Sequence, residues 1–139
     1  MPLKRELIER LHLEQCSCVI ANNQTVMSFH ERGVKDLHRL LHDQTQPLKG
    51  AFIADKVVGK GAAALMIAGE VKWVYAKVIS RAALALLDSS DTEVEYEVEV
   101  AYIVNRSGTG VCPVEQLCAT YTSAKDCLPA IDKFVRAQQ

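Results

Sequence analysis

The sequence lacks an excess of charge of either sign. Its 139 residues include 16 basic and 17 acidic ones, spread along the chain, for a formal net charge of −1. Such a chain has no field that would gather nucleic acid or an anionic membrane surface. We therefore expect neither nucleic acid nor a membrane among its partners.

Long hydrophobic runs are also missing. No segment approaches the roughly 20 apolar residues of a membrane helix, and the charged first ten residues lack the apolar core of a secretory signal. The cysteines are odd in number, in a chain that needs no disulfides to hold its core: Cys16, Cys18, Cys112, Cys118 and Cys127. We expect a cytoplasmic protein with reduced thiols.

No glycine-, proline- or serine-rich stretch suggests a linker. The composition, 49% apolar and 24% charged, is typical of a globular chain. A chain of this length buries roughly two-thirds of the surface that its unfolded form exposes. The sequence predicts one domain with one core over residues 1–139.

Hydrophobic spacing predicts a helix, a hairpin and a second helix in the first third of the chain. Apolar residues recur at helical spacing over residues 3–13 and from residue 33 to about residue 44. Between them, two β-prone runs at 16–21 and 25–29 flank Asn22-Asn23, a pair that accepts the positive φ of a tight turn.

The middle of the chain alternates strands and helices. Residues 50–55 and 71–79 are apolar on both faces, as covered strands are, and residues 59–68 form a helix that is apolar all round. A further helix is predicted over 81–87, with Ser80 as its N-cap.

Residues 93–100 alternate glutamate with an apolar residue, which predicts a strand with one solvated acidic face. A glycine-rich turn follows, then a short helix that opens at Cys112-Pro113 and a last helix near 128–136. The acidic face would also discourage pairing with the strand edge of another molecule.

Strands that alternate with helices pair in parallel through right-handed crossovers, and the hairpin adds an antiparallel part. The predicted fold is therefore α/β: a three-layer α-β-α sandwich with a mixed sheet. Ligands of such folds bind beyond the carboxyl ends of the strands, which places the segments of interest at 55–61, 78–81 and 105–115.

The first candidate segment joins a buried strand to a buried helix. Gly59 lets backbone N–H groups face a ligand, and Lys60 adds a positive charge. The spacing approximates a P-loop, but Ala54 replaces its first glycine and Gly61 its magnesium-binding hydroxyl, so hydrolysis of a nucleoside triphosphate is not expected. An anion site and an ordinary strand-to-helix turn both fit.

The second candidate segment places the thiol of Cys112 just before a helix, where the partial positive charge would lower its pKa, with Glu115 three residues on. A thiolate nucleophile is one interpretation. The other is a structural turn, in which Gly110 supplies a flexible backbone and Pro113 the first helical position.

Two patterns resemble metal sites but are interpreted otherwise. His38 and His42 have the spacing of two zinc ligands on one helix, yet no glutamate lies in the required place, and we expect exposed histidines. Cys16 and Cys18 share one face of a strand, where we expect them to pack as small hydrophobic residues. No metal and no other cofactor is predicted.

Several motifs together resemble a prokaryotic family of unknown function that is assigned a cytidine-deaminase-like fold. They span residues 18–115 and comprise Arg32-Gly33, the runs at 54–60 and 74–80, Asn105-Arg106, and the run at 108–115. Zinc deaminases take their ligands from the starts of two helices, and the corresponding places here hold Glu31-Arg32-Gly33 and Gly59-Lys60-Gly61. These residues lack the nitrogen and sulfur ligands of a catalytic zinc.

The sequence thus predicts a deaminase-like protein that acts without zinc on a small anionic or nucleoside-like metabolite. Cys112 and Glu115 are the candidate catalytic residues. The candidate ligand-binding residues are Arg32, Asp55, Lys56, Gly59, Lys60, Thr109 and Gly110. A non-catalytic binding or sensing module on the same crevice is the alternative, and a homo-oligomer is left open.

Overall fold

The computed structural model describes residues 3–23, 25–31, 34–105 and 107–138, and it begins with the predicted helix and hairpin. Helix α1 (Leu3–Leu13) is followed by β1 (Cys18–Asn22) and β2 (Thr25–Phe29). Asn23, in the turn between the strands, takes a positive φ of 55°. The predicted helix over 3–13 and the predicted hairpin are therefore confirmed.

The central elements follow in the predicted order. They are α2 (Lys35–Leu41), β3 (Phe52–Val58), α3 (Lys60–Ala68), β4 (Trp73–Ser80) and α4 (Arg81–Asp88). The hydroxyl of Ser80 accepts the N–H of Ala83 at 3.1 Å, which confirms the predicted N-cap.

Strand β3 is longer than the predicted run of 50–55. It continues because Val57 and Val58 pair with Val78 and Ile79 of β4, so that β-branched residues extend the parallel ladder. Asp55 and Lys56 accordingly lie within the strand, and the loop before α3 is reduced to Gly59.

The last elements are β5 (Glu93–Val100), α5 (Pro113–Cys118) and α6 (Ala124–Ala137). Helix α6 begins earlier than predicted because Ser123 caps it, accepting the N–H of Asp126 at 3.1 Å. Pro129 therefore lies inside α6.

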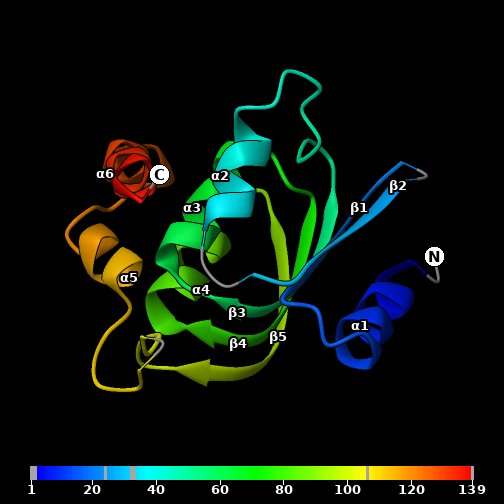
Figure 1. The fold of residues 1–139 in the computed structure, drawn as a ribbon, viewed down its shortest axis with the longest axis horizontal. Coiled ribbons are helices and arrows are strands. Elements are labelled where there is room, and N and C mark those ends of the chain that lie inside the picture. Colours follow the sequence, from blue (N-terminus) through cyan, green and yellow to red (C-terminus); the bar gives the residue numbers. More distant parts are fainter. Residues whose placement is uncertain (1–2, 24, 32–33, 106, 139) are drawn as a thin grey trace.

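The five strands form one mixed sheet in the order β2-β1-β3-β4-β5 (Figure 1). Strand β1 is antiparallel to both β2 and β3, whereas β3, β4 and β5 are mutually parallel. The parallel strands end at one edge, and α3 and α4 begin directly after β3 and β4 there.

The two faces of the sheet are covered unequally. Helix α1 packs alone on one face, where Leu7 and Leu11 meet Val19, Trp73 and Tyr75. The other face carries α2, α3 and α4 over the larger part of the core. The structure thus confirms an α/β domain with helices on both faces of a mixed sheet.

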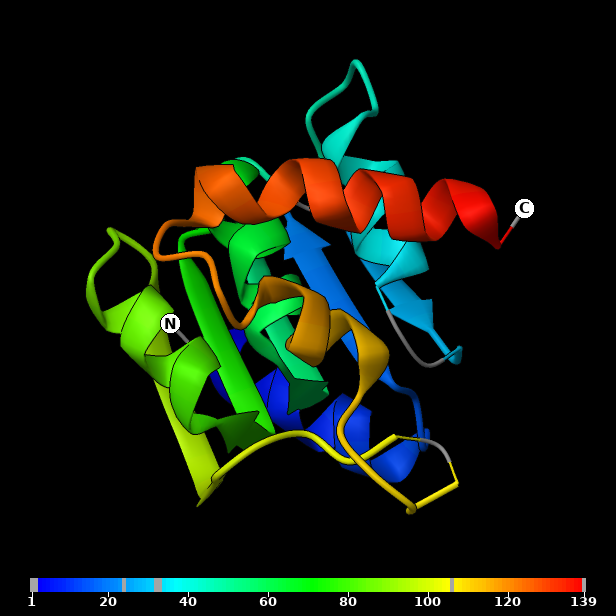
Figure 2. The ribbon, with the colours of Figure 1, turned by 90° about the vertical axis from the view of Figure 1, so that its left-hand side faces the viewer.

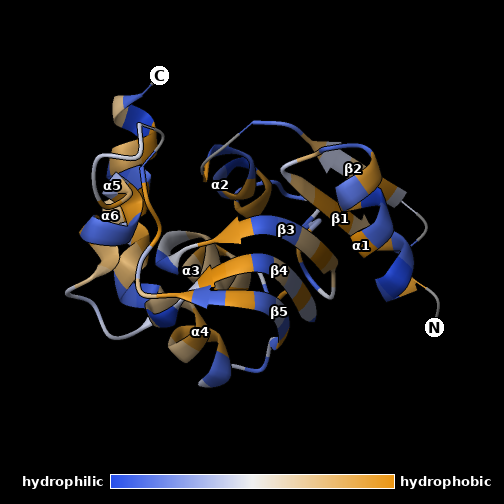
Figure 3. Cartoon of the chain, turned by 90° about the horizontal axis from the view of Figure 1, so that it is seen from below, coloured by the Kyte–Doolittle hydropathy of each residue, from blue (hydrophilic) through white to orange (hydrophobic). Residues whose placement is uncertain are grey.

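Helices α5 and α6 lie outside this arrangement. Figure 2 shows α6 running across the outer side of α3, and Figure 3 shows α1 and the α5–α6 pair on opposite sides of the sheet. Ile131 and Val135 of α6 are buried in the larger core. No helix among the described ranges is long and apolar enough to cross a membrane.

Strand β5 differs from its prediction on both faces. Tyr96 and Val98, expected to be covered, are 44% and 51% exposed because α4 covers only part of this edge strand. The acidic face is not simply solvated either. Glu95 accepts a hydrogen bond from the indole of Trp73 at 2.5 Å, and Glu97 lies 3.7 Å from His12 of α1.

The start of α3 is packed too tightly for a side chain at Gly61. A Cβ there would lie 2.2 Å from Cγ1 of the buried Val114. We predict that Gly61→Ala lowers the free energy of unfolding by about 1–3 kcal/mol, despite the better helix propensity of alanine. Urea unfolding measures the change. Gly110→Ala, whose Cβ would come no closer than 3.9 Å to Asn105, is the control, and equal stability of the two variants would contradict the prediction.

Candidate functional site

The buried carboxylate of Glu115 connects three segments at the edge where the parallel strands end. One oxygen, Oε1, accepts the backbone N–H of Lys60 at 3.0 Å and the hydroxyl of Ser80 at 2.7 Å. The other, Oε2, accepts the N–H of Ile103 at 2.9 Å. The two loops that the sequence singled out therefore meet at one rim.

The local sequence explains this placement. Pro113 occupies the first helical position of α5 and sets Glu115 in its first turn. Gly59 leaves room for the carboxylate, because a Cβ there would lie 3.1 Å from Oε2. With both oxygens engaged by protein donors, Glu115 has the surroundings of a structural group rather than of an acid or base that exchanges protons with a substrate.

The side chain of Lys60 is also engaged within the protein. Its ammonium group is buried and donates a hydrogen bond to the carbonyl of Tyr121, in the connection between α5 and α6. The thiols of Cys118 and Cys127 are near, and burial raises the pKa of Cys118 to about 12. Lys60 therefore holds the α5–α6 connection and does not extend toward the rim.

Cys112 is the one cysteine of the five that is not buried. It precedes α5 as the N-cap residue, and its N–H donates to the carbonyl of Ile103 at 2.7 Å. Thr109 and Gly110 lie in a turn that is closed on Asn105, whose side-chain oxygen accepts the N–H of Thr109 at 3.0 Å. Arg32 lies outside the described residues.

Asp55 is a buried carboxyl group whose burial outweighs the hydrogen bonds that stabilise its charge. It lies on β3 beside Cys18 of β1, and its Oδ1 accepts the N–H of Val57 at 3.3 Å. Among the residues that the structure describes, no lysine or arginine forms an ion pair with it. Burial raises the pKa of Asp55 to about 7, and burial, with the charge of Asp55 as a second cause, raises the pKa of the Cys18 thiol.

Asp55 and Cys18 lie near the start of α2, which is itself beside the start of α3. Asp36, in the first turn of α2, acts on the Cys18 thiol by its charge. The start of α3 lies beside the start of α2, because a Cβ on Gly61 would be 3.7 Å from Val34. Lys56 follows Asp55 on β3 and is half-buried, with its N–H donating to the carbonyl of Ser17 at 3.0 Å.

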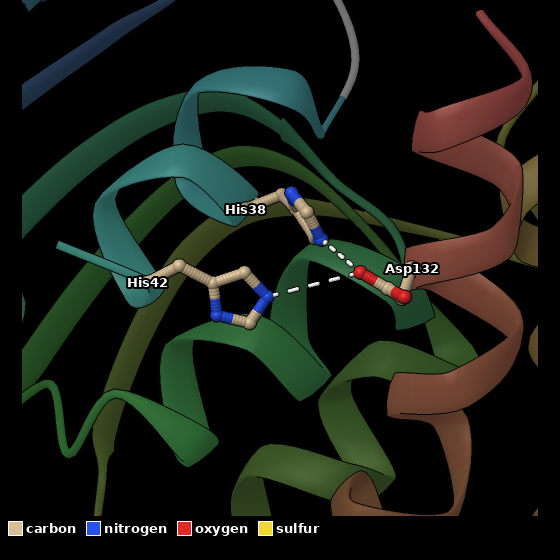
Figure 4. A group of neighbouring side chains, drawn as sticks. All are labelled: His38, His42 and Asp132. Carbon is tan, nitrogen blue, oxygen red and sulfur yellow. Dashed lines mark hydrogen bonds and ion pairs between the residues drawn. The ribbon is translucent and has the colours of Figure 1, made fainter.

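A second polar cluster lies between α2 and α6, away from this rim. His38 and His42 both direct Nε2 toward Oδ1 of Asp132, at 3.0 and 3.8 Å (Figure 4). The expectation of exposed histidines holds for His42 but is wrong for His38, whose side chain is only 13% exposed because it packs against α6. Sequence spacing indicated the two histidines but not Asp132, which is 94 residues from His38.

The fold is that of an α/β domain with a mixed sheet whose faces are unequally covered. Comparison with known proteins identifies its family. Residues 6–135 match the TM1506 family, a domain of unknown function (DUF1893), and the chain belongs to this family. A solved DUF1893 family protein from Thermotoga maritima has the same fold, with a TM-score of 0.84 and 22% sequence identity over 93% of this chain and 87% of the other. No curated protein matches the sequence.

The hydrogen bonds of Glu115 predict a large cost for a small change. In Glu115→Gln, the amide NH2 group must face one of the donors that the carboxylate now accepts. We expect a loss of about 2–4 kcal/mol in the free energy of unfolding, measured in urea. Glu93→Gln, the same change on an exposed side chain, is the control and should cost less than about 0.5 kcal/mol. Similar losses in both variants would show that Glu115 does not link the three segments.

The pKa of Asp55 predicts how stability depends on pH. Because the folded-state pKa is raised from 3.8 to about 7, this group stabilises the fold fully below pH 3.8 and loses that contribution as the pH rises to about 7. Asp55→Asn removes the cost of charging the group and can still accept the N–H of Val57. The variant should be more stable than the wild type by up to about 4 kcal/mol above pH 7 and about equal near pH 4.

Unfolding curves of both proteins across this pH range provide the measurement. A stability difference that does not change with pH would mean that Asp55 titrates at its ordinary pKa.

Proposed function

We propose that the protein is a deaminase-like domain that binds a small anionic or nucleoside-like metabolite, without a zinc ion at that site, at Asp55, near β1, β3 and the starts of α2 and α3. The observation that carries the proposal is the buried carboxyl of Asp55. A buried acid with no cation beside it among the described residues costs stability, and such costs concentrate at functional sites.

The place of Asp55 supports a ligand site for a second reason. Zinc deaminases take their zinc ligands from the starts of two helices, and the resemblance seen in the sequence implies that α2 and α3 are the corresponding helices. Here those starts are adjacent, and the described residues at them, Lys35 and Lys60, are not zinc ligands. A neutral or charged carboxyl can bind the amino or imino group of a nucleobase, and a group that titrates near pH 7 can exchange a proton with it.

The other candidate residues take different parts in this proposal. Lys60 already binds the Tyr121 carbonyl, and Lys56, which follows Asp55 on β3, directs its side chain to the opposite face of the sheet, so neither lysine is assigned to an anionic group at Asp55. Cys112 is the accessible thiol and serves as nucleophile or polar contact. Thr109 and Gly110 form the outer turn next to it, while Gly59 and Glu115 shape the rim.

The alternative is a non-catalytic binding or sensing module on the same site. Both oxygens of Glu115 already accept hydrogen bonds within the protein, so this residue is not free for acid–base chemistry, which favours the binding module. In that case Asp55 binds the ligand, and Cys112 is a cap residue of α5.

Binding is tested by thermal unfolding with cytidine, cytidine 5′-monophosphate and ribose 5-phosphate as separate probes. We expect at least one probe to raise the melting temperature of the wild type, by about 5–10 °C at a hundredfold excess over its Kd. Asp55→Asn should abolish this rise although the variant itself is folded. Asp91→Asn, the same change at an exposed residue, should preserve it. No rise with any probe, or an equal rise in Asp55→Asn, would contradict the proposal.

The substitution Cys112→Ser separates the two functions. Both proteins are incubated with a probe that binds. If the wild type releases ammonia and Cys112→Ser does not, although its thermal shift persists, the protein is an enzyme. A persistent shift with no ammonia release by the wild type favours the binding module.

A further inference from the structure

The cleft between α2 and α6 is independent of the proposed metabolite site. Its volume is about 310 Å³, and the apolar side chains of Leu65 and Leu128 form part of its lining. The polar part of the lining includes His38, His42 and Asp132. Polar side chains that converge over an apolar lining are typical of sites that hold a ligand or an ion.

Three potential metal ligands come together in this cleft. Nε2 of His38 lies 3.0 Å and Nε2 of His42 lies 3.8 Å from the same oxygen, Oδ1 of Asp132. All three ligand atoms lie within 4.8 Å of one another. Figure 4 shows the two imidazole rings, from neighbouring turns at the end of α2, pointing to the carboxylate of α6.

These separations approach those of a tetrahedral metal centre. Zinc binds imidazole nitrogen at about 2.0–2.1 Å and carboxylate oxygen at about 2.0–2.2 Å, so ligand atoms around one ion are roughly 3.3 Å apart. The separations of 3.0 and 3.8 Å lie on either side of this value. Rotation of exposed His42 toward the cleft and a small outward movement of Asp132 would complete the geometry.

The carboxylate of Asp132 is oriented by a neighbouring side chain of α6. Arg136 lies one helical turn beyond Asp132 and donates from Nε to Oδ2 at 3.0 Å, which leaves Oδ1 directed at the histidines. Such outer hydrogen bonds fix metal ligands in position. His38 is constrained as well, since its side chain is mostly buried between the helices.

We propose that His38, His42 and Asp132 bind one divalent transition-metal ion of the zinc class, with water from the cleft as the fourth ligand. Two imidazoles and one carboxylate suit Zn²⁺, whereas Mg²⁺ and Ca²⁺ prefer sites made of oxygen alone. Because its ligands come from α2 and α6, the ion joins two helices that are far apart in the chain and stabilises their contact.

The test uses the chelator-treated full chain titrated with zinc chloride in a calorimeter. The wild type should bind one Zn²⁺ per chain, and zinc should raise its melting temperature. His42→Ala, which removes a side chain that is 59% exposed, and Asp132→Asn should each weaken binding at least tenfold. His12→Ala removes another exposed histidine, in α1, whose side chain is 42% exposed, and should leave the affinity unchanged.

Cobalt substitution separates this site from one built on the five cysteines. Co²⁺ bound by imidazole and carboxylate should give a spectrum without a thiolate-to-cobalt charge-transfer band. The proposal is overturned if the wild type binds no zinc, if His42→Ala binds it as tightly as His12→Ala, or if the cobalt spectrum contains the thiolate band. None of these outcomes depends on Asp55, so the metabolite site stands or falls separately.

Discussion

The carboxylate of Glu115 accepts hydrogen bonds from the start of α3, from the N-cap of α4 and from the segment that follows β5. Helices α3 and α4 both leave the same edge of the sheet, and their first N–H groups need acceptors there. The carboxylate of Glu115, a buried residue of α5, accepts the backbone N–H groups of two segments and the hydroxyl of Ser80 in the third. The rim of the sheet, and the α5–α6 layer that covers α3, depend on this group.

The two buried carboxyl groups of the domain differ in how their charge is stabilised. Glu115 accepts three hydrogen bonds of 2.7–3.0 Å, whereas Asp55 accepts the N–H of Val57 at 3.3 Å and weaker interactions from the N–H of Lys56 and the Cys18 thiol, which do not offset its burial. Full hydrogen bonding offsets the cost of burying a charge, and partial hydrogen bonding does not. The first arrangement is that of a structural support, and the second is typical of a group kept for a ligand.

Local patterns predicted most of the fold. Helix α1, the hairpin, the Ser80 cap and the parallel strands all follow from spacing and capping residues within a few positions of one another. What could not be predicted depends on the tertiary partner. The exposure of Tyr96 and Val98 follows from the limited reach of α4, and the last part of β3 exists because β4 has apolar residues opposite it.

The candidate sites show the same division. The sequence indicated the loops that contain Gly59 and Glu115 as candidate site segments, and the structure brings these loops together. The roles of Glu115 and Lys60 could not be predicted, because the groups that bind them within the protein come near only in the folded chain. Asp132 could not be associated with His38, because three strands and three helices separate α2 from α6 in the chain and the two helices meet only in the folded structure. The sequence predicts Asp55 as a ligand-binding residue, while its burial against Cys18 is visible only with the register of β1 on β3.

The acidic face of β5 also limits how two copies of this domain could associate. The strand lies at the end of the sheet with one edge unpaired within the chain, and it carries Glu93, Glu95, Glu97 and Glu99 on one face. If two copies joined these edges into a continuous sheet, glutamates of both would line the same surface a few ångströms apart, and their repulsion would oppose the pairing. Growth of the sheet from one copy into another is therefore disfavoured at the β5 edge.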